Sequence, residues 1–407
     1  MKFRTENPRG LTSVRSIRRV AALCAPLALF LCATAQAQPP GPPGETFAAV
    51  TFVEGLRNPW SMAFLPNGDM LVTERRGQLR IIRDGQLLPD PVPGVPEVRA
   101  QGQGGLQDVV LHPDFESNRL IYLSYAKPNE DGSLGTTGLS RARLEDDRLT
   151  DVEEIFEADA WADTPGHFGA RIAFDDEGYL FMSVGDRMAG LSMQGMDPDL
   201  EGHPSQDNSN HQGTIVRLND DGSVPGDNPF VVQEGVRPEI WSWGHRNQQA
   251  LAFHPESGDL WSAEHGPQGG DELNLIRAGA NYGWPVIGYG ANYVVGTEIH
   301  ASRGRANMEQ PAAFWVPSIG ISGLAFYDGD AFPNWRGNAF AGGLSGNYQR
   351  LVRISLSGQT VINREPMLVG EYRIRDVRVG PDGLLYIATD NIFGQPSEII
   401  RLEPTDE

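Results

Sequence analysis

Cysteine is almost absent from this chain of 407 residues, which contains only Cys24 and Cys32. Both lie in an N-terminal segment that we expect to be removed, so the mature protein is predicted to have no disulfide and no cysteine-ligated metal. Long hydrophobic runs are also scarce, because the apolar stretch at residues 20–31 is too short to span a bilayer comfortably. We therefore expect no membrane insertion of the mature chain.

The N-terminal segment has the layout of a secretory signal peptide. Basic residues at 15–19 precede the apolar stretch, and small residues ending at Ala37 follow it. We therefore predict a signal peptide at residues 1–37 and a periplasmic or secreted mature protein. Residues 38–45 contain QPPGPPG and are predicted to form a flexible leader, because proline and glycine favour neither helix nor sheet.

Positive charge is in deficit, with 33 Lys and Arg against 53 Asp and Glu and a formal net charge of −20. Loss of the predicted signal peptide would remove more basic than acidic residues and leave the surface more acidic. Such a surface repels nucleic acid and anionic membranes, so neither is an expected partner. A glycine fingerprint for dinucleotides, placed between a strand and a helix, is not apparent either.

Helical periodicity is missing after residue 40, whereas short apolar strands recur around turns that contain Pro, Asp, Asn or Gly. Six copies of this hairpin phrase begin at Met62, Asp108, Arg171, Ala250, Gly323 and Asp376. They predict an all-β fold, a six-bladed β-propeller of four-stranded antiparallel blades over residues 46–407. A β-sandwich would not normally repeat one turn phrase six times. The loops between the repeats are expected to carry function.

Several phrases between the repeats resemble one enzyme family. They are GQGGL from Gly102, HFGARI from His167, GHRNQQALAFHP from Gly244, EHGPQGGDELN from Glu264, NYGWP from Asn281 and YRIRDV from Tyr372. In this order, over nearly the whole mature chain, they resemble the soluble sugar dehydrogenases that depend on pyrroloquinoline quinone (PQQ), especially the aldose sugar dehydrogenase branch. The resemblance implies a quinoprotein, related to soluble glucose dehydrogenase, that oxidises aldoses at the anomeric carbon to lactones. Hydride would pass to calcium-bound PQQ and then electrons to an unidentified acceptor, in a monomer or homodimer.

A histidine in a glycine-flanked loop is the candidate general base. His167 lies in TPGHFG before the third repeat, where its imidazole is expected at a propeller face and can accept a hydroxyl proton near neutral pH. The resemblance assigns it that catalytic role and makes Asp186, after GYLFMSVG, its acidic partner. The alternatives are a solvated loop histidine and an aspartate that only shapes a turn.

The resemblance also implies a set of side chains that bind the cofactor. Arg373 and Arg375 stand two apart in YRIRD, hence on one face of a strand, and match arginines that bind its carboxylates. Arg246 and Asn247 match residues that contact the quinone, where Arg246 would stabilise the oxygen that gains charge. Gln103 matches an amide ligand. The alternative for the arginines is a solvated strand face.

Calcium takes carbonyl and carboxylate oxygens, and the glycines of EHGPQGGDELN allow carbonyls to point inward. By resemblance, Gly266 and Pro267 offer their carbonyls to a calcium ion that also touches the quinone. Glu272 and the carbonyl of Tyr282 match a second calcium position, and Asp271 could support either one. The phrase is not an EF-hand loop, so without the resemblance it indicates no more than an acidic turn.

The chain departs from the family pattern in two places. Where glucose-oxidising relatives place a lysine on the cofactor, it reads GGLSGNYQR, which leaves Ser345 or nearby backbone as the contact. The residue before His167 is Gly166 and not an acid. Trp315 resembles an aromatic wall on the sugar side of the pocket. Two other functions stay open: a calcium-dependent six-bladed lactonase, and a propeller that only binds a protein or glycan.

Overall fold

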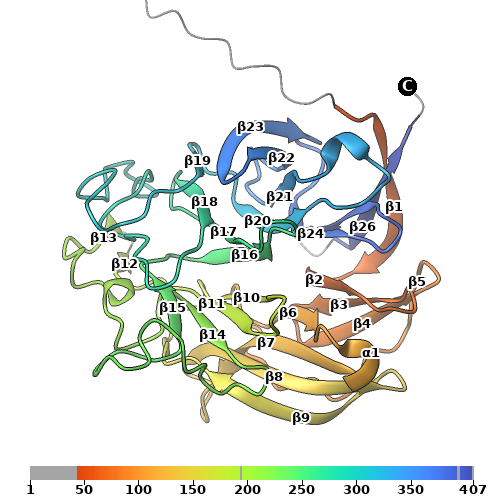
Figure 1. Ribbon diagram of the computed structural model, residues 1–407, viewed down its shortest axis with the longest axis horizontal. Helices are drawn as coiled ribbons and strands as arrows, with labels where there is room; N and C mark the ends of the chain where they lie inside the picture. The colour runs from red at the N-terminus through yellow and green to blue at the C-terminus, as the bar shows by residue number, and fades with distance from the viewer. Residues whose placement is uncertain (1–43, 193–194, 392–394, 406–407) are drawn as a thin grey trace, which may run out of the picture. The chain divides into compact units, whose positions relative to one another are not determined.

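The computed structural model describes residues 44–192, 195–391 and 395–405, which form almost entirely β-structure. Six antiparallel sheets of four strands follow one another in these ranges and form the predicted six-bladed propeller (Figure 1). Nearly all of the predicted signal peptide and leader lies outside the described residues, so both stay predictions. The helices in the described part of the chain are all too short or too polar to span a bilayer.

Each blade runs from an inner strand near the centre of the ring to an outer edge strand (Figure 1). Blade 1 contains β2 (Pro59–Phe64), β3 (Met70–Glu74), β4 (Gln78–Arg83) and β5 (Gln86–Leu87). Blade 2 contains β6 (Leu106–Leu111), β7 (Leu120–Pro128), β8 (Gly135–Glu145) and β9 (Arg148–Glu157). Blade 3 contains β10 (Gly169–Phe174), β11 (Leu180–Val184), β14 (Thr214–Leu218) and β15 (Ile240–Trp243).

Blade 4 contains β16 (Gln248–Phe253), β17 (Leu260–Glu264), β18 (Asp271–Leu275) and β19 (Ala313–Trp315). Blade 5 contains β20 (Ile321–Phe326), β21 (Ala339–Gly343), β22 (Arg350–Ser357) and β23 (Thr360–Met367). Blade 6 contains β24 (Ile374–Val379), β25 (Leu385–Thr389), β26 (Ser397–Pro404) and β1 (Phe47–Leu56). The connections hold α1 (Phe115–Asn118), the 3₁₀ turns η1 (Pro204–Gln206) and η2 (Pro333–Trp335), and the short hairpin of β12 (Leu191–Ser192) and β13 (Gly195–Met196).

The two ends of the described chain close the ring. Strand β1 pairs antiparallel with β26, in a register that sets Phe47 opposite Pro404 and Leu56 opposite Ser397. The outermost strand of blade 6 therefore comes from the N-terminal side of the domain, while its other three strands come from the C-terminal side. The blade that completes the propeller depends on pairing between distant parts of the sequence.

Burial follows strand position within the blade. The second strands β3, β11 and β17 are buried at every residue, because neighbouring blades pack on both of their faces. The edge strand β23 alternates between exposed and half-buried residues. A hydrophobic cluster fills each of the six contacts between successive blades in the described structure. The core is thus a ring of apolar layers around a polar centre.

A buried arginine holds the blades together at this centre. Arg171, on the inner strand β10, donates from Nε to the carbonyl of Gln249 at 2.7 Å and from Nη2 to the carbonyls of Trp60 and Arg375 at 3.4 and 3.3 Å. Its guanidinium also lies 4.0 Å from the centre of the Trp60 ring and pairs with the carboxylate of Asp108. One cation thereby fixes backbone atoms from several blades beneath the cavity described below.

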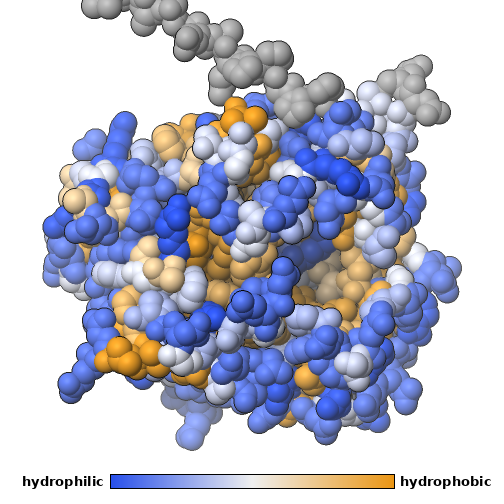
Figure 2. All heavy atoms as spheres, viewed as in Figure 1, coloured by the Kyte–Doolittle hydropathy of each residue, from blue (hydrophilic) through white to orange (hydrophobic). Residues whose placement is uncertain are grey.

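Loops that carry the predicted site meet on one face of the propeller. The inner and second strands of a blade are antiparallel, so the start of the first and the end of the second lie on the same side. Gln103, His167 and Arg373 precede inner strands, whereas Asp186 and Ser345 follow second strands. On the face drawn in Figure 2, both hydrophilic and hydrophobic side chains border a hollow near the middle of the ring.

Candidate active site

The predicted base and its predicted acidic partner are in direct contact. His167 Nδ1 lies 2.7 Å from Asp186 Oδ1, and both side chains are buried. The second carboxylate oxygen of Asp186 accepts a hydrogen bond from the indole nitrogen of Trp284 at 2.8 Å. Because an ionised carboxylate can only accept, Nδ1 carries the proton and the lone pair of the ring lies on Nε2. This is the tautomer that a general base at Nε2 requires.

The charge states of the pair follow from their surroundings. Burial, and then the positive charge of Arg246, lowers the pKa of His167 below its usual range. Burial alone would raise the pKa of Asp186, but His167 and Arg246 hold it below its usual range. At neutral pH the site therefore combines a neutral imidazole with an ionised carboxylate.

The loop that carries His167 is held in a strained conformation. His167 has a φ of 51°, in the left-handed region that side chains other than glycine seldom adopt. Its amide donates to Gln103 Oε1 at 2.9 Å. The guanidinium of Arg187 donates to the carbonyls of Gly166 and, at 3.0 Å, Thr164, so it clamps the residues just before the base. The carbonyl of Gly166 thus helps to hold this loop, at the position where glucose-oxidising relatives are expected to carry an acid.

A cationic cavity of about 250 Å³ lies beside this loop. Its lining includes Gln103, Ser345, Arg373 and Arg375, so four of the predicted cofactor contacts share one space. The two arginines face a single acid, Asp390, with Oδ2 at 2.6 Å from Arg373 Nη1 and 3.2 Å from Arg375 Nη2. The buried Nε of Arg375 has no partner among the described residues. The excess of positive charge and the unpaired donor fit an anionic ligand.

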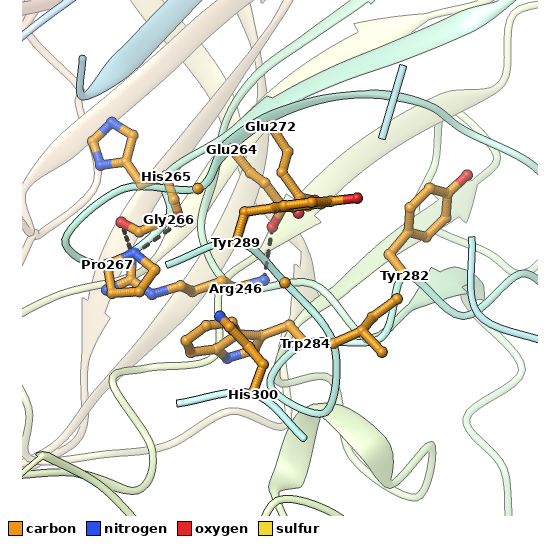
Figure 3. Close-up of a pocket in the computed structure, with 14 residues that line it drawn as sticks. Arg246, Glu264, His265, Gly266, Pro267, Glu272, Tyr282, Trp284, Tyr289 and His300 are labelled. Carbon is orange, nitrogen blue, oxygen red and sulfur yellow. Dashed lines mark hydrogen bonds between the residues drawn. The ribbon is translucent and has the colours of Figure 1, made fainter. Parts of the chain in front are cut away.

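Arg246 lines a smaller cavity of about 20 Å³, shown in Figure 3, and His265 lines both cavities. The Nη1 of Arg246 donates to the carbonyls of His265 and Gly266, each at 3.0 Å, and its Nη2 to the hydroxyl of Tyr293 at 3.1 Å. The guanidinium lies 5.2 Å from the centre of the Trp284 ring. The Gly266 carbonyl, a predicted calcium ligand, therefore already faces a positive group.

All four predicted calcium ligands, Gly266, Pro267, Glu272 and Tyr282, line this smaller cavity. Burial, and then the nearby Glu264 carboxylate, raises the pKa of Glu272 to about 8, which makes the position favourable for a cation. Within the described ranges, no three His, Cys, Asp or Glu side chains converge on a possible metal position. The predicted ligands are mostly carbonyls, so their grouping still fits a calcium ion.

Two other predicted residues have different surroundings. Asp271 accepts hydrogen bonds from the amides of Gly266 at 2.9 Å and Ile321 at 3.1 Å, so it supports the loop from within the fold. Trp315 ends β19, packs against the apolar layer between blades 4 and 5, and has Arg364 5.2 Å from its ring centre. Trp315 lines neither cavity, and its contact with sugar stays a prediction.

A model of the glucose and sorbosone dehydrogenase family matches residues 56–401. The chain belongs to this family. Aldose sugar dehydrogenase YliI of Escherichia coli K12 is 43% identical over 355 residues, which cover 86% of this chain and 91% of that protein. The resemblance found in the motifs is therefore confirmed.

Solved structures of the family share the fold over most of the chain. The apo-form of the soluble aldose sugar dehydrogenase from E. coli superposes with a TM-score of 0.81 at 40% identity, covering 88% of this chain and all of that one. The PQQ-bound form of the aldose sugar dehydrogenase from Streptomyces coelicolor gives a TM-score of 0.68 at 28% identity, covering 89% and 99% of the two chains.

Sequence reasoning missed several residues of this family member's site. They are Trp284, Arg187, Gln249, His265 and Asp390. A signal for Asp390 was present, because an acid ends or closely follows the second strand in four blades, at Glu74, Asp186, Glu264 and Asp390. Gln249, His265 and Trp284 lie inside the phrases that resemble the family, but nothing in those phrases indicated their contacts. Arg187 lies outside them, and it acts on residues of another loop.

Proposed function

We propose that the protein is a quinoprotein sugar dehydrogenase that oxidises aldoses at the anomeric carbon to lactones, with PQQ and calcium as cofactors. The observation that carries the proposal is the buried pair of His167 and Asp186, 2.7 Å apart, beside a cavity with paired arginines. A general base alone is compatible with many reactions. Here the base lies next to a cationic cavity that fits a ligand with several negative charges, and PQQ, with three carboxylates, is such a ligand.

His167 would remove the proton of the anomeric hydroxyl through Nε2, and Asp186 would stabilise the imidazolium that forms. Arg246 would stabilise negative charge that develops on a nearby oxygen, as a fixed cation in a largely buried site. When bound, PQQ would supply the quinone that accepts hydride, and calcium would polarise that quinone.

The cofactor would be held by residues that already have suitable donors. Arg373 and Arg375 would bind the carboxylates of the cofactor, while Gln103, Asn247 and Ser345 would form uncharged hydrogen bonds with it. Gly266 and Pro267 would bind one calcium ion through their carbonyls. Glu272 and the Tyr282 carbonyl would bind another.

Reconstitution of the purified apoprotein tests this function. Reduction of an artificial dye is expected with aldoses only when both PQQ and calcium are added. Dye reduction with a nicotinamide cofactor alone would contradict the proposal, and so would the absence of turnover across a broad aldose panel. A lactonase with this metal needs no cavity lined by arginines, and a propeller that only binds a protein or glycan predicts no turnover with any quinone.

The site of action follows from the predicted signal peptide. We propose that the mature protein is periplasmic or secreted and that a separate electron acceptor reoxidises the cofactor. Cell fractionation with mass spectrometry of the mature N-terminus tests export. Retention of residues 1–37 in a cytoplasmic form would contradict it.

A further inference from the structure

A glutamine of blade 4 lies in the floor of the cationic cavity. Gln249 is on the inner strand β16, within the irregular pairing with β17 between Gln248 and Ala250. The residue is 6% exposed and lines the cavity. The side chain of Gln248 donates instead to the carbonyl of Thr214 at 3.2 Å, toward the neighbouring blade. The two adjacent glutamines therefore have different surroundings.

The amide of Gln249 joins two predicted cofactor contacts. Its Oε1 accepts from Arg375 Nη1 at 2.9 Å, and its Nε2 donates to Asn247 Oδ1 at 3.0 Å. The backbone carbonyl of Gln249 accepts from Arg171 Nε at 2.7 Å, which fixes the strand below. Both ends of the side-chain amide are thus engaged, and the amide has one favourable orientation.

The orientation of the Gln249 amide restricts the side chains of Asn247 and Arg375. Asn247 Oδ1 also accepts from the amide of Gly169 at 3.2 Å, so the Nδ2 group of Asn247 is the end available to donate to a ligand. Arg375 is held between Gln249 and Asp390, which limits the directions in which its guanidinium can point. One neutral amide thereby arranges a donor and a cation from blades 4 and 6.

We propose that Gln249 is a positioning residue, which acts through Asn247 and Arg375 to prepare the cavity for its anionic cofactor. The inference rests on the proposed function and adds a residue to it. Gln249 supplies no charge, so its effect on affinity comes from orientation. Pre-arranged partners lose less conformational freedom on binding, which strengthens binding without a new contact.

Binding of PQQ in the presence of calcium and without sugar measures this effect directly. Gln249→Met removes both hydrogen bonds at similar volume and is expected to raise the dissociation constant of PQQ ~10-fold. Gln248→Met is the matched control, because it removes a buried amide from the adjacent residue that faces away from the cavity. The control is expected to change the melting temperature but to change PQQ affinity less than about twofold.

A double-mutant cycle separates positioning from direct contact. If Gln249 acts through its partners, the effect of Gln249→Met shrinks in an Arg375→Met background and also in an Asn247→Ala background. Fully additive effects in both backgrounds would show that Gln249 contacts the cofactor itself and would overturn the inference. Gln249→Asn serves as a second variant if Gln249→Met does not fold. Its amide is too short to reach both partners, so it is expected to weaken PQQ binding in the same way.

The outcomes for this inference and for the proposed function are distinct. Wild-type protein that binds no PQQ would overturn both. Wild-type protein that binds PQQ, with equal affinity in Gln249→Met, would overturn the positioning role alone. A similar loss in Gln248→Met and Gln249→Met would also overturn it, since the effect would then follow general destabilisation.

Discussion

At the scale of single residues, the chemistry depends on His167. Replacement by glutamine keeps a polar side chain but removes the basic nitrogen, so turnover is expected to fall ~10²-fold or more. Asp186→Asn is expected to cause a smaller loss, because Asp186 acts on the imidazole through Nδ1. Steady-state kinetics at saturating sugar, with PQQ binding measured separately, checks both. Unchanged turnover in the His167 variant would exclude it as the base.

The pKa of His167 sets the acid limit of activity. A base must be neutral to work, and burial together with Arg246 lowers the pKa of His167 below its ordinary 6.5. Activity should therefore persist as the pH falls through 6.5 and decline only below it. The pH profile of turnover measures this. An Arg246→Gln variant, which removes a nearby cation, is expected to move the acid limb to higher pH, and a move to lower pH would contradict the assignment.

The sequence was informative about which residues react and less so about what orients them. His167 and Asp186 stand in short phrases that the family resemblance identifies, and the structure brings them together. Trp284 lies 98 positions from Asp186 and donates to it all the same. No local pattern indicates such a contact, because it exists only after blades 3 and 4 have packed. Gln249 also escaped prediction, because its contact with Arg375 exists only once blades 4 and 6 have packed.

At the scale of elements, the start of β24 supplies the charge for the cofactor. Arg373 directly precedes β24, and Arg375 is its second residue. Both form ion pairs with Asp390, which directly follows β25. Carboxylates remote from the reacting carbon keep their charge throughout the reaction, so these contacts affect binding and not the barrier. Arg375→Ala is expected to raise the dissociation constant of PQQ ~10-fold or more, through loss of a charge-assisted pair.

Turnover at saturating PQQ should then recover substantially in the Arg375 variant. A fluorescence titration gives the affinity, and dye reduction at increasing PQQ gives the turnover. If affinity is unchanged while turnover collapses, the arginine acts in the chemistry and the family correspondence fails at this end of the chain.

At the scale of the whole molecule, closure of the ring depends on β1. A variant that lacks residues 1–56 would leave the edge of β26 without its partner. Exposed edge strands pair with other chains, so this variant is expected to melt at lower temperature and to associate. Calorimetry and sedimentation measure both effects against a variant that starts at residue 44. An equally stable, monomeric truncation would show that β1 is dispensable.

Six hairpin phrases predicted the number and type of blades, because each hairpin is a local pattern. They did not predict that blade 6 takes its outer strand from the N-terminal side. Thr46 and Thr405 exchange hydrogen bonds across 359 positions, and local periodicity contains no information about pairing at that separation. Closure of the ring by β1 could be inferred only from the general need of an exposed edge strand, here β26, for a hydrogen-bonding partner.

That closure also orders events in time. Strand β1 is synthesised before the other strands, yet it cannot find β26 until residues 397–404 have been made. Arg373, Arg375 and Asp390 belong to the same late segment, so the cofactor cavity has no complete wall before that moment. Cofactor loading is therefore expected to follow the synthesis of all six blades. A ribosome-stalled or C-terminally shortened chain should capture none.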